Sequence, residues 1–215
     1  MTGARGDPEY MKEQSLVRTS QVDPNTPIEK TVGAMAELVK EGKVKYLGLS
    51  DCTAAGLDRA NALRSPSSTS SQQRARTGRK SSPTHPLGRG FLTGQIKSID
   101  DLDADDFRRT VPKFSAGNFS RILDLADKIG EVGKAHNATS GQKTLAWSLA
   151  QGDDFFVIPG TKKPKYLYEN AGAASVKLTA EEIAEVRWAA EATEIPGDRY
   201  GAAFNEMTYV DSPPL

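Results

Sequence analysis

Two short loops carry residues that suit phosphate binding. Gly88-Arg89-Gly90 places a basic side chain between two glycines, and Lys162-Lys163 follows directly on Gly160-Thr161. Adjacent lysines and the amides at a helix start are natural partners for a phosphate, whose charge is about −2. Either loop alone is a weak signal, because a lysine turn that merely caps a helix has the same composition. Both loops are candidate phosphate contacts whose meaning depends on the elements around them.

Other reactive residue types are sparse. Cys52 is the single cysteine, so no internal disulfide forms. His85 lies in a Ser-rich stretch, and His136 falls on the polar side of a predicted helix C-terminus, where a surface role is expected. No cluster of ligand-type residues predicts a metal site.

The elements that must position these loops alternate between helix and strand. Apolar residues recur at helical spacing in several windows, and short apolar runs follow them. The predicted helices cover 26–42, 120–136, 141–150 and a segment from Thr179; the predicted buried strands cover 44–49 and 155–158. This order predicts an α/β protein.

Two helix starts carry the pattern of a capping box. Thr26 precedes Glu29 by three residues with Pro27 at the first helical position, and Thr179 precedes Glu182 in the same way. In the first helix the predicted buried stripe consists of Ile28, Val32, Met35 and Val39. Gly42 is expected to end this helix.

The composition excludes several classes of protein. Lys plus Arg and Asp plus Glu both count 28, so the net charge is zero and neither nucleic acid nor an anionic membrane is an expected partner. The first residues, MTGARGDPEYMKEQ, are not a signal peptide, and the longest apolar run is FFVI at 155–158. We expect a soluble cytoplasmic protein; the oligomeric state is not readable from these features.

Residues 64–85 differ from the rest of the chain. They hold seven serines and five basic residues, but no acidic residue and no large aliphatic side chain. Such a segment is expected to bury nothing. One interpretation is a disordered, phosphorylatable or RNA-touching linker; the other is a non-native insert produced by an altered reading frame or splice choice.

Four blocks together resemble the aldo-keto reductases, in particular the NADP-dependent branch found in fungi, plants and bacteria. They lie at 22–51, 86–94, 144–152 and 157–173, and they include PLGRGFLTG and VIPGTKKPKYLYENAGA. The family has a (β/α)8 barrel fold and transfers hydride to a carbonyl. The resemblance implies an incomplete (β/α)8 TIM-barrel that lacks strands 1–4 and 6–7, as one partial domain over 1–215.

The family's catalytic set is an Asp, a Tyr, a Lys and a His, of which the Tyr protonates the developing alkoxide. Residues 6–13 resemble the segment before the fourth strand, and the stretch 14–27 is too short for that strand and its terminal His. No tyrosine matches the proton donor. The resemblance therefore implies no catalytic residue in this chain.

The chain matches the family's cofactor-binding residues better than its catalytic residues. Resemblance assigns Ser50 and Asp51 to the nicotinamide carboxamide. It assigns Leu87, Gly88, Arg89, Gly90 and Leu92 to the pyrophosphate. The residues assigned to the adenosine 2′-phosphate and adenine are Gly160, Thr161, Lys162, Lys163, Glu169 and Asn170. The implied cofactor is NADP(H), bound more weakly than in an intact relative.

Three functional hypotheses follow. The chain is an aldo-keto reductase by descent, acting on a small-molecule carbonyl in intact relatives and inactive here. Alternatively it is a cofactor-binding or regulatory pseudoenzyme. The third is that the true gene product is an active reductase and residues 64–85 record an error in the gene model. The natural substrate is not readable from the sequence.

Overall fold

The computed structural model describes residues 18–19, 22–44, 47–62, 81–132, 134–206 and 208–215. Its contacts divide the chain into two compact units. The first unit contains Met1–Gln73 and Ala202–Leu215, and the second contains Arg74–Gly201. The expectation of a single partial domain over 1–215 stays a prediction, and residues 64–80 of the Ser-rich segment lie outside the described residues.

The first unit begins with two short parallel strands. β1 (Arg18–Thr19) pairs with β2 (Gly48–Leu49), in the register Arg18 with Gly48 and Thr19 with Leu49. We expected no strand between residues 14 and 27, so β1 corrects that prediction. The pairing needs only two residues, which a sequence pattern does not reveal.

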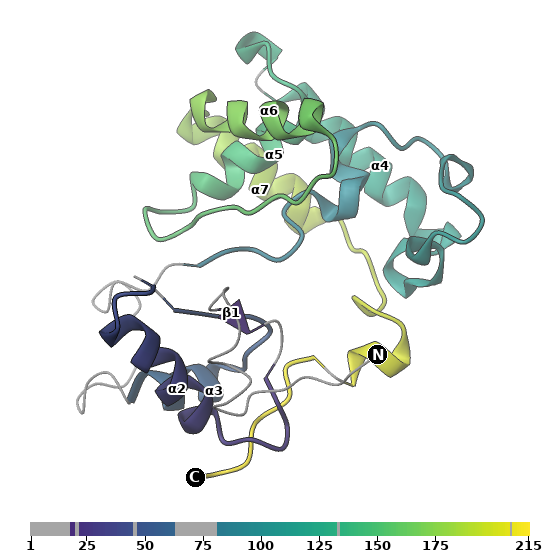
Figure 1. The fold of residues 1–215 in the computed structure, drawn as a ribbon. Coiled ribbons are helices and arrows are strands. Elements are labelled where there is room, and N and C mark those ends of the chain that lie inside the picture. Colours follow the sequence, from purple (N-terminus) through teal and green to yellow (C-terminus); the bar gives the residue numbers. More distant parts are fainter. Residues whose placement is uncertain (1–17, 20–21, 45–46, 63–80, 133, 207) are drawn as a thin grey trace. The chain divides into compact units, whose positions relative to one another are not determined.

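Helices α2 (Ile28–Lys40) and α3 (Ala54–Ala62) contact each other in this unit, and α8 (Ala202–Asn205) is a single turn (Figure 1). The α2 face that is buried contains Ile28, Val32 and Met35, as predicted. Val39 was predicted on this face but is 37% exposed, and Leu38 is buried instead. Gly42 follows the helix with φ of 70°, the left-handed conformation expected of a C-terminal glycine.

The predicted capping box at Thr26 is wrong. The Thr26 hydroxyl donates to Asp23 Oδ2 at 3.0 Å, and no side chain caps the start of α2. Pro27 occupies the N-cap position without a side-chain cap. Glu29, the expected second half of the box, accepts hydrogen bonds from Arg59 at 2.8 and 2.7 Å. These bonds hold the pKa of Glu29 below its ordinary value.

Arg59 also fixes the C-terminal segment onto the first unit. Its guanidinium donates to the carbonyl oxygens of Ser212 at 2.8 Å and Pro213 at 2.6 Å. The buried Ser212 hydroxyl in turn accepts from the amide of Ile28 at 2.9 Å. One otherwise uncapped donor at the start of α2 is thereby satisfied by a residue near the end of the chain.

The second unit is a group of packed helices. The α-helices are α4 (Ala116–Glu131), α5 (Ser140–Leu149), α6 (Pro164–Gly172) and α7 (Ala180–Ala192). Among the described residues of this unit, four short 3-10 helices precede α4, namely η2 (Gly88–Thr93), η3 (Ile99–Asp101), η4 (Phe107–Thr110) and η5 (Pro112–Phe114), and η6 (Lys134–His136) and η7 (Ala173–Ser175) lie between the α-helices. The helix predicted over 120–136 therefore starts four residues earlier and ends at Glu131.

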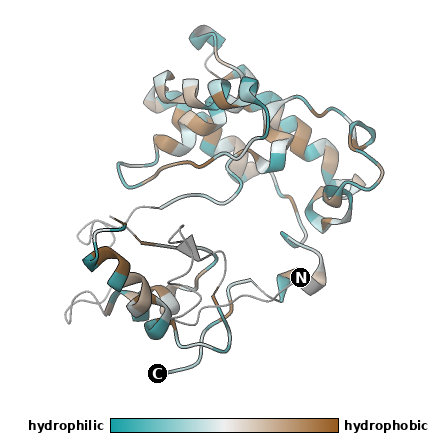
Figure 2. Ribbon diagram, in the orientation of Figure 1, coloured by the Kyte–Doolittle hydropathy of each residue, from teal (hydrophilic) through white to brown (hydrophobic). Residues whose placement is uncertain are grey.

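Apolar side chains of α4 hold this unit together. Phe119 and Ile122 contact Phe91 in one core cluster, and Leu125 and Ile129 contact α7 in another. Figure 2 shows the apolar residues of these helices interrupted by polar ones, as the helical spacing predicted. The core thus follows the buried face of an amphipathic helix.

The strand predicted over 155–158 is reduced to one residue. Phe155 forms a parallel bridge with Ser81, in which Ser81 donates to Asp154 and accepts from Phe156. Phe156 and Ile158 are 43% and 47% exposed, so this apolar run lacks the buried surroundings that would extend it. Next to this bridge, the hydroxyl oxygen of Ser82 is buried. This corrects the expectation that residues 64–85 bury nothing.

The described elements follow the order strand, helix, strand, helix at the start, with helices dominating thereafter. This is an α/β chain with short parallel pairings, as an incomplete barrel requires. Within the described residues, no helix has the length and apolar character needed to cross a membrane.

The predicted capping box of α7 is confirmed and generates the first test. Thr179 accepts from the Glu182 amide at 3.2 Å, and the Glu182 carboxylate accepts from the Thr179 amide at 2.8 Å. Thr179→Ala should lower the free energy of unfolding by about 1 kcal/mol, because a helix-start amide loses its acceptor. Urea unfolding measures the change. Thr179→Ser, which keeps a hydroxyl at the N-cap position, is the matched control and should change stability less.

Acid should weaken the same site. The Thr179 amide and then His136, whose Nε2 lies 2.9 Å from the carboxylate, lower the pKa of Glu182 below 4.5. A lowered folded-state pKa stabilises the protein above pH 4.5, and that contribution is lost as pH falls through the lowered value. Glu182→Gln keeps the cap geometry and should flatten this part of the stability profile. Parallel profiles for both proteins would contradict the assignment.

Candidate functional site

The turn before α6 gathers exposed positive charge at a helix start. Gly160, Thr161, Lys162 and Lys163 are all exposed, and Lys163 is the N-cap residue. The Lys163 amide donates to the Thr161 hydroxyl at 3.2 Å, which fixes the turn. Because the N-terminus of a helix carries partial positive charge, this arrangement favours a bound anion.

Neighbouring residues that the sequence reasoning missed extend this turn. The ammonium groups of Lys163 and Lys165 each lie 5.8 Å from the centre of the Tyr166 ring. The Tyr166 hydroxyl donates to Gln95 Oε1 at 2.8 Å, which connects α6 to the loop that follows η2. The run of three lysines around Pro164 was a readable signal for Lys165, whereas the Gln95 contact is visible only in the structure.

Glu169 holds α6 against α5. Its carboxylate accepts from the Thr139 hydroxyl at 2.7 Å, and its backbone carbonyl accepts from Gln142 Nε2 at 3.0 Å. A methyl group built on Gly141 would lie 3.7 Å from this carboxylate, 3.7 Å from Thr93 and 3.8 Å from Leu87. The start of α5 therefore brings α6 and the 87–93 loop together. Asn170 is half-buried on the same helix.

The 87–92 loop is tightly wound upon itself. Gly88, Arg89 and Gly90 have φ angles of 57°, 56° and 97°. The amide of Gly88 donates to His85 at 2.8 Å, and the amides of Gly90 and Leu92 donate to Leu87 at 2.9 and 3.3 Å. These three amides are occupied within the loop and are not presented to a phosphate.

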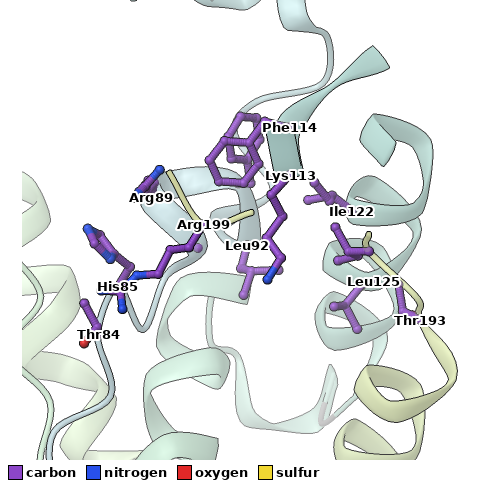
Figure 3. Close-up of a pocket in the computed structure, with 13 residues that line it drawn as sticks. Thr84, His85, Arg89, Leu92, Lys113, Phe114, Ile122, Leu125, Thr193 and Arg199 are labelled. Atoms are coloured by element: carbon purple, nitrogen blue, oxygen red, sulfur yellow. The ribbon is translucent and has the colours of Figure 1, made fainter. Parts of the chain in front are cut away.

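The Arg89 side chain turns inward from this loop. Its guanidinium lies 4.6 Å from the Tyr200 ring, 4.9 Å from Phe107 and 5.8 Å from Phe114. The side chain lines a cavity of about 380 Å³ (Figure 3). The sequence indicated that this basic side chain binds a phosphate, but it did not reveal that three aromatic rings surround the guanidinium.

The remaining predicted residues lie elsewhere. Ser50 and Asp51 directly follow β2 in the first unit, at the carboxyl end of the parallel pair, and Asp51 has φ of 49°. The other predicted cofactor residues all belong to the second unit. His136 was expected to have a surface role; its Nε2 lies 2.9 Å from the Glu182 carboxylate, and its side chain is 24% exposed. The described residues include no cluster of potential metal ligands.

Comparison with known proteins identifies the family. The aldo/keto reductase family model matches residues 13–75 and 72–191. Aldo-keto reductase str7 of Strobilurus tenacellus is 53% identical over 243 residues, which cover 99% of this chain and 72% of that protein. Aldo-keto reductase yakc [NADP(+)] of Schizosaccharomyces pombe is 42% identical, over 88% of this chain and 61% of that protein. The chain thus spans roughly two thirds of the length of these relatives.

Solved structures agree on the fold. A glycerol dehydrogenase from Gluconobacter oxydans superimposes with a TM-score of 0.74 at 18% identity, over 91% of this chain and 68% of that one. The thermostable aldo-keto reductase Tm1743 gives 0.50 at 24% identity, over 80% of this chain and 58% of that one. The fold is therefore an incomplete aldo-keto reductase barrel. On the family model and the relatives from Strobilurus tenacellus and Schizosaccharomyces pombe, the chain belongs to the aldo/keto reductase family.

Proposed function

We propose that this chain is an aldo-keto reductase-type oxidoreductase by descent that binds NADP(H) weakly and does not itself reduce carbonyls. In intact relatives the substrate class is a small-molecule carbonyl, and NADPH supplies the hydride. The name of the Schizosaccharomyces pombe relative includes NADP(+), which supports this choice of cofactor. The balanced charge of the chain supports a small-molecule partner over a nucleic acid.

The start of α6 is the observation that carries the binding proposal. Lys162 and Lys163 are exposed beside a helix N-terminus, and the exposed Lys165 lies in the first turn of that helix. The adenosine 2′-phosphate fits this position because both the helix dipole and the ammonium groups favour a dianion. Glu169, anchored by Thr139, keeps the helix start in place against α5.

The pyrophosphate half is the weaker part of the proposed site. Donors for a pyrophosphate would come from the 87–92 loop, but Gly88, Gly90 and Leu92 use their amides internally. The Arg89 guanidinium lies against the rings of Phe107 and Tyr200. Binding would therefore require this loop to open, and the free energy of opening is subtracted from the affinity.

Catalysis fails for a separate reason in this proposal. None of the tyrosines matches the family's proton donor by sequence, so the alkoxide would take its proton from water. General acid catalysis usually contributes about 10²–10⁴-fold to a rate. Ser50 and Asp51, assigned by resemblance to the carboxamide, are the proposed nicotinamide contacts.

Binding of 2′,5′-ADP tests the phosphate site. Changing Lys162 and Lys163 to Ala together should weaken this binding by about tenfold at low salt, because two exposed charge pairs are lost. The preference for 2′,5′-ADP over 5′-AMP should disappear in the same variant. Calorimetry at low and moderate salt is the measurement, since charge-dominated binding falls with ionic strength.

Lys128→Ala is the control for this experiment, because Lys128 is exposed on α4 outside the proposed site. Its affinity for 2′,5′-ADP should equal that of the unaltered chain. Tight binding that salt leaves unchanged would show a preorganised site and contradict the proposal. So would an equal loss in the control.

An activity assay tests the catalytic part. The 215-residue chain with NADPH and 4-nitrobenzaldehyde should consume no measurable reduced nicotinamide. An unaltered full-length aldo-keto reductase, assayed in the same buffer, shows that the reagents are competent. Turnover by the chain at a rate close to that enzyme's would refute the absence of a proton donor.

A further inference from the structure

The cavity beside Arg89 combines positive charge with apolar walls. It measures about 380 Å³ and lies wholly within the second unit. Arg89, Lys113 and Arg199 line it, together with His85 and Thr84, and none of the described acidic residues does. Six apolar side chains complete the wall: Phe91, Leu92, Phe114, Ile122, Leu125 and Ile195. Figure 3 shows Arg199 extending between Arg89 and Leu92, with Lys113 entering from the side of Phe114.

Arg89 has no partner for its charge within the described residues. Both terminal nitrogens, Nη1 and Nη2, are buried and make no hydrogen bond. Contacts with three aromatic rings offset part of the cost of burial, but a ring face does not replace a hydrogen-bond acceptor. A buried guanidinium without an acceptor is expensive, so the arrangement calls for an anion.

The neighbouring arginine shows what a satisfied guanidinium looks like in this unit. Arg108 donates to the Asp106 carboxylate at 3.0 Å from Nε and 2.6 Å from Nη2. Its remaining nitrogen, Nη1, donates to the backbone carbonyl of Arg89 at 3.0 Å. The charge of Arg108 is therefore neutralised by the Asp106 carboxylate. Arg89, whose backbone is held in a left-handed conformation at φ of 56°, has no such carboxylate partner among the described residues. Backbone strain of this kind is characteristic of ligand sites.

We propose that this cavity binds a small apolar organic acid whose carboxylate is held by Arg89. The parallel Nη1 and Nη2 groups match the two oxygens of a carboxylate, and the apolar wall suits an aromatic or aliphatic body. Lys113, half-buried on the wall, adds attraction for the same charge. This ligand is distinct from the 2′-phosphate of the proposed function, which faces the lysines before α6, and it would compete only with a pyrophosphate at the 87–92 loop.

A carboxylate and a phosphate share the chemistry that Arg89 would recognise, so the experiment separates them. The probe is 2-naphthoate, titrated calorimetrically into the full chain, with the neutral isostere 2-naphthamide as its partner. We expect 2-naphthoate to bind at one site and about tenfold more tightly than the amide, because only the acid accepts charge-assisted hydrogen bonds. Adding saturating 2′,5′-ADP, which addresses the lysines before α6, should leave the 2-naphthoate affinity unchanged.

Two variants assign the binding to the cavity. Arg89→Met should reduce the affinity for 2-naphthoate by about tenfold and abolish the preference over the amide. Lys113→Met should reduce it by about threefold, and it keeps the test valid if Arg89→Met does not fold. Lys128→Met removes an exposed charge on the outer face of α4 and should change nothing.

Four results would overturn the proposal. They are equal affinities for acid and amide, an unchanged affinity in both cavity variants, displacement of 2-naphthoate by 2′,5′-ADP, and an absence of binding by the unaltered chain. Displacement would show that Arg89 serves a nucleotide phosphate instead. A failure of 2′,5′-ADP to bind would concern only the proposed function, because that probe addresses the lysines before α6.

Discussion

The packing of Phe91 determines the geometry of the second unit. Its side chain is 1% exposed, and its ring lies 4.3 Å from Phe114 and 5.4 Å from Phe119, the latter edge-on. Burying a large aromatic side chain contributes more than any single polar contact in this region. With Phe91 fixed in the core, the two residues before it must reverse the chain, which accounts for the left-handed conformations of Arg89 and Gly90. The inward course of Arg89 follows from the same turn.

A side chain at the start of α5 holds the end of α4 in place. Lys143 of α5 is 4% exposed, and its ammonium donates to the carbonyl of Gly130, in the last turn of α4, at 2.5 Å. A positive charge there satisfies an otherwise unpaired helix carbonyl and complements the helix dipole. Burial lowers the pKa of Lys143 at the same time. Because the same end of α5 also anchors Glu169, through Thr139 and Gln142, the candidate phosphate turn depends on this helix being held in place.

Helical spacing predicted most of the helices because a helix buries a face that its own sequence specifies. The predicted buried face of α2 was wrong at one position, where Leu38 is buried in place of its neighbour Val39. The predicted cap of α2 was wrong because the Thr26 hydroxyl bonds to Asp23 and does not cap the helix. Strand extents were harder, since a strand exists only where a partner pairs with it, and Phe155 pairs with the single residue Ser81. Residue types likewise indicated that Arg89 meets an anion, but the direction of its side chain depends on Phe91 and three aromatic rings from distant parts of the chain.

The two matches to the family model and the two compact units meet at the same place in the sequence. The two family-model matches meet at residues 72–75, and the boundary between the compact units falls between Gln73 and Arg74. The match to the Strobilurus relative extends over 243 aligned residues, more than the 215 of this chain, so that relative has internal positions absent here. Each unit has its own buried clusters, around Ile28 and Met35 in one and around Phe91 and Ile129 in the other. In a barrel, a continuous ladder of parallel strands unites such clusters, and a chain that lacks part of that ladder retains them as separate cores.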